Sequence, residues 1–207
     1  MSGIASRASL EEEIYLRSLT GYLVGQHLLE GYSKVAVITY PDRICSAMAA
    51  ALVTSYISRS GYRESPAAVL TYEEGKERDL ARKVLELKPD AVYISFGGEQ
   101  KLSYVGEITR KVVTSLSQEG YRGSLLLHVR VWLATKQLSL LLSDPSLAAY
   151  LASLKEIRVF TADVPNRKFL FHKVVIEGSS AKLEKLKEAP ITQEHAKLLS
   201  ISLPPPE

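Results

Sequence analysis

The order of apolar runs along the chain is the feature that most limits its fold, because short β-branched runs alternate with longer segments of helical periodicity. The strand-like runs lie at residues 34–40, 67–72, 91–96, 124–131 and 157–161. The helical segments lie at residues 10–29, 44–60, 73–87, 101–116 and 133–154. Such alternation predicts βαβ units, so we expect an α/β fold with a mainly parallel sheet and helices on both faces.

The alternation breaks near the C-terminus, where a turn signal at residues 162–168 leads directly into another strand-like run at residues 169–176. Two adjacent strands without a helix between them predict an antiparallel hairpin at the C-terminal edge of the sheet. We therefore expect one α/β domain over residues 1–178.

The remaining residues, 179–207, are expected to form a charged helical tail. Its charged first part is predicted to be helical, Pro190 is predicted to break that helix, and residues 192–199 to form a short second one.

Composition excludes several classes of protein. The 207 residues suffice for one core, and 46% hydrophobic with 24% charged residues is typical of an ordinary globular chain. A net charge of +3 is too small for a protein that coats nucleic acid by bulk electrostatics. The single cysteine, Cys45, cannot form an internal disulfide and is expected to be a small buried hydrophobe. The four histidines lack metal-ligand spacing, so we predict no metal site. No cofactor is predicted either.

The first ten residues have neither the basic start nor the apolar run of a secretory signal. No apolar stretch approaches the roughly 20 residues that a membrane-spanning helix requires. We therefore expect a cytoplasmic protein with no membrane partner.

The loop that follows the strand-like run at residues 91–96 has the strongest claim to bind a ligand. Ligands of parallel sheets bind outside the carboxyl ends of the strands. The loop consists of Gly97, Gly98, Glu99, Gln100 and Lys101. Paired glycines allow a close approach to the backbone, and the next helix directs free N–H groups outward, which suits a phosphate. The alternative is that the two glycines only make a tight strand-to-helix turn.

Residues 13–130 carry a resemblance to a known family. The segments EIYLRSL, KVAVITYPD, VLTY, VYISFGGEQKLS and LLLHVRV occur in an order that resembles the CARF domain, the CRISPR-associated Rossmann fold of archaeal and bacterial antiviral proteins. Within that family, the chain resembles the CARF domains that are joined to a winged-helix domain. The resemblance implies a Rossmann-like fold and a ligand-sensing role in a CRISPR antiviral response.

In that family a glycine-rich loop and the loop after the first strand bind a cyclic oligoadenylate across the axis of a homodimer. The resemblance places this ligand on the loop from Gly97 to Lys101, with Ser6 and Arg7 as first-loop residues. Some members also cleave the bound ring, as metal-independent ring nucleases. No clear general base is evident here, so no catalytic residue is assigned.

The end of the chain extends the resemblance, because KEAPITQEHAKLL is similar to the linker and first helix of a winged-helix domain. Only the eight residues 200–207 follow Leu199, too few for a recognition helix and a wing. We therefore expect no sequence-specific DNA binding.

Two alternatives remain open. The segments KVAVITYPD and KPDAVYI, with a helix ending at Gly61 and Tyr62, resemble one lobe of a periplasmic-binding-type receptor for a small molecule. The absence of an export signal and of a second lobe counts against this reading. The third possibility is a scaffold or regulatory domain whose glycine loop only turns the chain.

Overall fold

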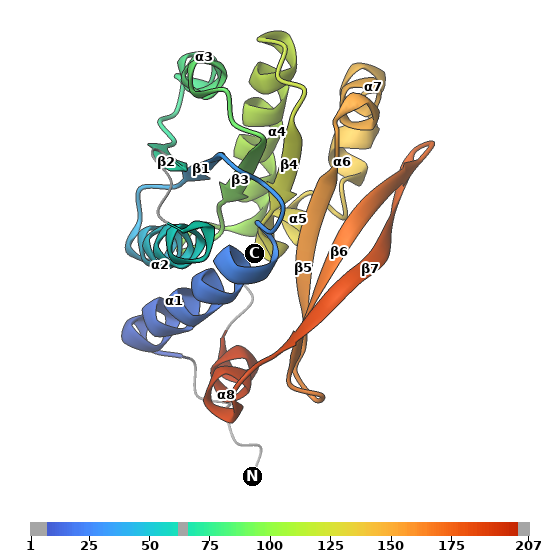
Figure 1. The fold of residues 1–207 in the computed structure, drawn as a ribbon. Helices are drawn as coiled ribbons and strands as arrows, with labels where there is room; N and C mark the ends of the chain where they lie inside the picture. Colours follow the sequence, from blue (N-terminus) through green and yellow to red (C-terminus); the bar gives the residue numbers. More distant parts are fainter. Residues whose placement is uncertain (1–7, 62–65, 203–207) are drawn as a thin grey trace.

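A computed structural model describes residues 8–61 and 66–202 and shows one seven-stranded sheet between two layers of helices (Figure 1). The strands are β1 (Val35–Thr39), β2 (Ala67–Thr71), β3 (Ala91–Ser95), β4 (Ser124–Leu127), β5 (Ile157–Asp163), β6 (Lys168–Glu177) and β7 (Ser180–Pro190). The helices are α1 (Leu10–His27), α2 (Arg43–Ser60), α3 (Glu77–Leu87), α4 (Leu102–Gln118), α5 (Val129–Ala134), α6 (Ser139–Leu142), α7 (Pro145–Ser153) and α8 (Gln193–Ile201).

The strands are ordered β2-β1-β3-β4-β5-β6-β7, and the first five in this order are parallel. β6 and β7 run antiparallel to their neighbours. The predicted α/β fold, with its mainly parallel sheet and antiparallel C-terminal edge, is thus confirmed.

Both faces of the sheet are covered, which explains why β1, β3 and β4 are buried along their whole length. One core joins the sheet to α3, α4 and the short helices α5 to α7. The other joins the opposite face to α1, α2 and α8. Cys45 lies in α2 and is buried, as the composition predicts. None of the described helices is both long and apolar enough to span a membrane.

The strand predicted at residues 124–131 is too long, because β4 ends at Leu127. His128 caps α5, and its Nδ1 accepts a hydrogen bond from the backbone N–H of Arg130 at 3.1 Å. The prediction failed because a short apolar run suits a buried strand and a buried helix equally well. The consequence is that Arg130 turns back toward the loop after β3.

The charged helix predicted after residue 178 is also wrong. Ser180–Pro190 forms β7, which pairs with β6 from Glu177 and Ser180 at the turn to Lys168 and Pro190 at the far end. The many charged residues of this segment led to the prediction of a solvent-exposed helix. In the structure they belong to an edge strand, where charge discourages pairing with other chains. The short helix predicted at residues 192–199 is present as α8.

Candidate functional site at the carboxyl edge of the sheet

The order in which strands are added to the sheet reverses between β1 and β3. From β1 the chain crosses to β2 at the sheet edge, and it then returns to place β3 on the other side of β1. As a result, α2 follows β1 on one face and α4 follows β3 on the opposite face. The loops that lead into these helices meet at the carboxyl ends of the strands, the position where doubly wound sheets bind ligands, and an open hollow beside them is called the crevice here.

The loop after β1 supplies one wall of this crevice. Asp42 caps α2, with its Oδ1 accepting a hydrogen bond from the backbone N–H of Cys45 at 2.6 Å. Arg43 reaches across the crevice, where its Nε and Nη2 donate to the two carboxylate oxygens of Glu99 at 3.1 and 3.2 Å. Pro41 and Ser46 complete the lining of an open hollow with an empty volume of about 710 Å³.

Gly97 and Gly98 lie directly after β3 at the predicted edge, but both are buried. Their carbonyl oxygens accept hydrogen bonds from Arg130 Nη1 at 2.6 and 2.9 Å. The N–H of Gly98 donates to Gln100 Oε1 at 3.2 Å. A Cβ at Gly98 would lie 2.4 Å from Asp42 Oδ1, so only glycine fits there. The two glycines therefore form a tight turn packed on Arg130 and Asp42, and their backbone is not open to a ligand.

The other loop residues face outward. Glu99 is exposed in its pair with Arg43, and Gln100 Nε2 donates to Asp42 Oδ2, which ties the loops after β1 and β3 together. Lys101 is the exposed N-cap of α4, where no side chain caps the helix. Lys101 forms no ion pair with any residue that the structure describes. Of the predicted loop, Glu99 lines the hollow, Gln100 is bonded to Asp42 in its wall, and Lys101 follows at the exposed start of α4. Ser6 and Arg7 lie outside the described residues.

A buried polar layer lies beneath the diglycine turn. Arg17, His128 and Arg130 are only 5%, 2% and 7% exposed. Arg17 Nη2 forms an ion pair with Glu13 at 3.5 Å. Burial lowers the pKa of Arg17, and burial together with repulsion by Arg17 lowers the pKa of Arg130 to about 9. Burial is the main cause that holds the pKa of His128 well below its ordinary value, and repulsion from the guanidinium groups of Arg17 and Arg130 adds to it. The imidazole is therefore neutral.

The sequence analysis missed this layer and gave His128 no role. A signal was present in the first helix, where Glu13, Arg17 and Thr20 recur at helical spacing on the face that also carries Val24. Polar residues on a buried helix face mark a site where they must find partners. Nothing in the sequence pairs Arg17 with Arg130.

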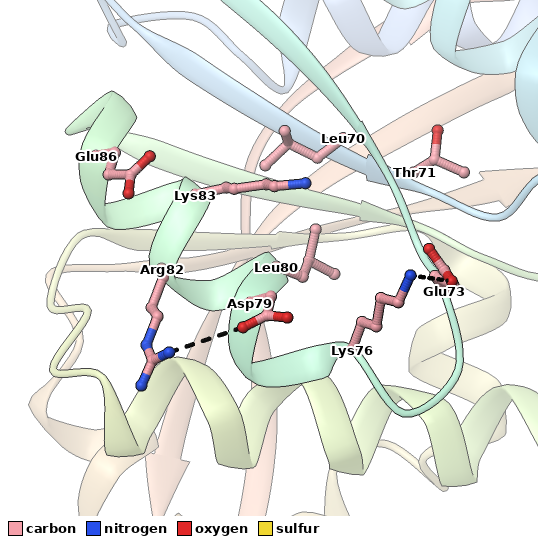
Figure 2. Close-up of a pocket in the computed structure, with 9 residues that line it drawn as sticks. All are labelled: Leu70, Thr71, Glu73, Lys76, Asp79, Leu80, Arg82, Lys83 and Glu86. Carbon is pink, nitrogen blue, oxygen red and sulfur yellow. Dashed lines mark ion pairs between the residues drawn. The ribbon is translucent and has the colours of Figure 1, made fainter.

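A second hollow, of about 1020 Å³ empty volume, lies at the sheet edge between β2 and α3 (Figure 2). Its charges largely pair with close neighbours, as Lys76 does with Glu73 at 2.5 Å and Arg82 with Asp79 at 3.7 Å. It lies at the outer strand and not where the strand order reverses. We therefore take the crevice between β1 and β3 as the candidate site. Within residues 8–61 and 66–202, no three His, Cys, Asp or Glu side chains gather as a metal site.

Solved structures with related folds share little sequence with this chain. A periplasmic binding protein type 1 from Bordetella pertussis Tohama I is 11% identical with a TM-score of 0.49, and the match covers 70% of this chain and 34% of that one. A protein from Rhodospirillum rubrum, assigned as a branched-chain amino acid ABC transporter, is 15% identical with a TM-score of 0.48, covering 73% and 40%. A leucine binding protein from Thermotoga maritima MSB8 is 14% identical with a TM-score of 0.40, covering 75% and 39%.

The chain thus spans well under half of the length of each of these proteins. At 11 to 15% identity and TM-scores below 0.5, these likenesses carry no conclusion about what this chain binds or does. They are to ligand-binding receptors of the periplasmic-binding type, which is the alternative left open by the sequence, and not to the CARF family.

The CARF assignment is therefore wrong. The same finding overturns the expected cyclic oligoadenylate ligand, the homodimer and the role in CRISPR antiviral defence. The ring-nuclease possibility rested on the same resemblance. The order of strands and helices that suggested the family is shared by many doubly wound sheets, so it does not identify one. The diglycine turn, which was to bind the ligand, is buried against Arg130 and Asp42.

No curated protein matches the chain in sequence. A family model described as "Uncharacterized protein" matches residues 13–198, which is most of the chain. This match runs from the first helix through the sheet and into α8. The chain belongs to this family.

Proposed function

We propose that this chain is a ligand-binding lobe of a small-molecule receptor and that its ligand binds in the crevice between the loops after β1 and β3. The observation that carries the proposal is the reversal of the strand order at β1 and β3, which brings the loops after these two strands together beside an open hollow at the carboxyl edge. A lobe of this kind is the periplasmic-binding alternative that the sequence suggested.

The charges around the crevice favour a small zwitterion. Arg43 and Lys101 present cationic groups, and Glu99 presents a carboxylate on the same edge. Arg43 and Glu99 are 64% and 39% exposed, so separating them to admit a ligand costs little. An α-amino acid would place its carboxylate near Lys101 and the uncapped start of α4, and its ammonium near Glu99.

L-Leucine is a suitable first probe, and thermal unfolding is a suitable measurement. A ligand at a hundred times its Kd stabilises the folded state by about 2.7 kcal/mol, which raises the Tm of a chain of this size by roughly 5 to 10 °C. Two analogues separate the charges: 4-methylpentanoate lacks the amino group, and 3-methylbutylamine lacks the carboxylate. We expect L-leucine to raise the Tm and each analogue to raise it much less.

The variants Lys101→Ala and Glu99→Gln should reduce the effect of L-leucine. The matched control is Lys83→Ala, because Lys83 is an exposed lysine on α3 beside the other hollow (Figure 2). Lys83→Ala should respond as the wild type does. An unchanged Tm in the presence of L-leucine, or a shift that survives both crevice variants, contradicts the proposal.

A further inference from the structure

β2 forms one edge of the sheet, and its outer side carries unpaired backbone groups. The strand pairs only with β1, in parallel, and the backbone N–H of Tyr72 donates to the carbonyl oxygen of Thr39 at 2.8 Å. Alternate residues of a parallel strand bond to the same neighbour, so Leu70 also bonds to β1, and Val69 and Thr71 direct their N–H and C=O groups outward. These outward groups have no hydrogen-bond partner among the residues that the structure describes.

The two edges of the sheet differ in how they are protected. β7, at the opposite edge, carries lysine and glutamate side chains along its length, and such charges discourage pairing with another strand. β2 has the sequence AAVLT, with neither a charge nor a proline, and its central side chain, Val69, is 47% exposed. Five residues are an ordinary length for a strand. An uncharged edge of this kind is a template for another extended chain.

The second hollow, described above, lies directly beside this edge. Leu70 and the buried Leu80 give it an apolar lining, and its empty volume of about 1020 Å³ leaves room for added side chains. Leu70 points to the face of the sheet that α3 covers. Side chains of neighbouring strands that share a face contact each other, so every second side chain of an added strand would lie beside Leu70 in this hollow.

Lys83 gives the hollow a positive charge that is not neutralised. The other two cations of the lining pair with acidic neighbours, whereas Lys83 forms no ion pair with any described side chain. Figure 2 shows Lys83 extending over the hollow toward Leu70. Glu86, which is also unpaired among these side chains, follows three residues later on α3. A strand added to β2 would therefore be favoured if it brought a carboxylate to Lys83.

We propose that β2 docks an extended peptide segment of another protein, which pairs with Val69 and Thr71 as a further strand and directs an acidic side chain at Lys83. Main-chain hydrogen bonds supply the affinity, and the hollow supplies the preference for an acidic residue. A second copy of β2 would offer only AAVLT, which has no carboxylate for Lys83. The hollow shares no lining residue with the crevice, so this proposal goes beyond the proposed function.

The first test measures amide hydrogen exchange of the wild-type chain by NMR. Two short capped peptides are the probes, Thr-Val-Glu-Val-Thr and Thr-Val-Lys-Val-Thr, which differ only in the central charge. In the free chain the amides of Val69 and Thr71 should exchange fast. The acidic peptide should slow them about tenfold at about ten times its Kd, and the lysine peptide should slow them much less.

Three results would overturn the proposal. The first is unchanged exchange at Val69 and Thr71 with the acidic peptide at about 1 mM, the Kd of a weak complex. The second is equal slowing by the two peptides. The third is protection of these amides in the free chain, which would show that the edge is already covered. If that protection disappears on dilution, a second copy covers it.

The second test exchanges the charge of the hollow. Lys83→Glu should reverse the preference, so that the lysine peptide slows exchange more than the acidic one does. Glu86→Gln is the matched control on the same helix and should respond as the wild type does. A Lys83→Glu chain that still prefers the acidic peptide contradicts the assigned role of Lys83. Both side chains are exposed, so these variants are expected to fold.

The third test removes one outward N–H. Val69→Pro should prevent the acidic peptide from slowing exchange at Thr71, because proline has no N–H to donate. Val69→Thr keeps the N–H and the branched side chain and should retain the effect. If Val69→Pro does not fold, the wild-type and Lys83→Glu measurements decide. None of these results depends on whether L-leucine binds in the crevice.

Discussion

Among single residues, Gly97 is strongly constrained in two independent ways. Its φ of +96° lies in the left-handed region, and a Cβ there would lie 2.6 Å from the Cβ of Arg130. Gly97→Ala should therefore lower the free energy of unfolding by about 2 to 4 kcal/mol, from backbone strain and overpacking together. Urea denaturation of the purified variant measures this loss.

Gly120→Ala is the matched control, because Gly120 has a φ of +86° but open space where its Cβ would be. It should lose only the backbone part, about 1 to 2 kcal/mol. Equal losses in the two variants would show that the contact of Gly97 with Arg130 is not tightly packed.

At the scale of elements, the docking of α8 on α1 should depend on pH. His195 in α8 is buried, with its Nε2 3.2 Å from Thr20 Oγ1 of α1 and its ring 5.0 Å from that of Phe169. Burial lowers the pKa of His195 to about 4. The unfolded chain takes up a proton near pH 6.5, whereas the folded chain does so only near pH 4. This contribution to stability is therefore fully present above pH 6.5 and is lost as the pH falls toward 4.

Urea denaturation at pH 7.5 and at pH 4.5 measures the effect, which amounts to about 2 to 3 kcal/mol for this histidine. The wild-type difference also contains the other buried histidines. His195→Gln has no proton to take up, so it should show a smaller loss between the two pH values. A variant whose stability falls as steeply as that of the wild type would rule out His195 as a source.

At the scale of the whole molecule, the sheet should be most stable at its centre and least stable at its edges. β1 and β3 are buried along their whole length and pair with strands on both sides. β7 is mostly exposed and pairs only with β6. Native-state hydrogen exchange should therefore give the slowest amides in β1 and β3 and clearly faster ones in β7. Uniform protection across all seven strands would contradict this expectation.

The candidate site was only partly predictable. The sequence located the loop from Gly97 to Lys101 at the carboxyl edge, because strand-helix alternation shows which segments follow strands. The sequence could not show whether the backbone of Gly97 and Gly98 is open to solvent or packed against the protein. That outcome depends on Arg130, whose position follows from the unpredicted end of β4 at Leu127 and the short helix α5 after it.

By itself, the sequence determined the α/β class, the order of most elements and the antiparallel edge, because periodicity and turn signals are local properties of the chain. Only the tertiary structure decided the strand order and its reversal between β1 and β3. It also decided that residues 180–190 pair as a strand and that Arg17 and Arg130 meet beneath the diglycine turn. These outcomes depend on contacts between residues far apart in the chain, and local patterns carry no information about which distant partner a segment will find.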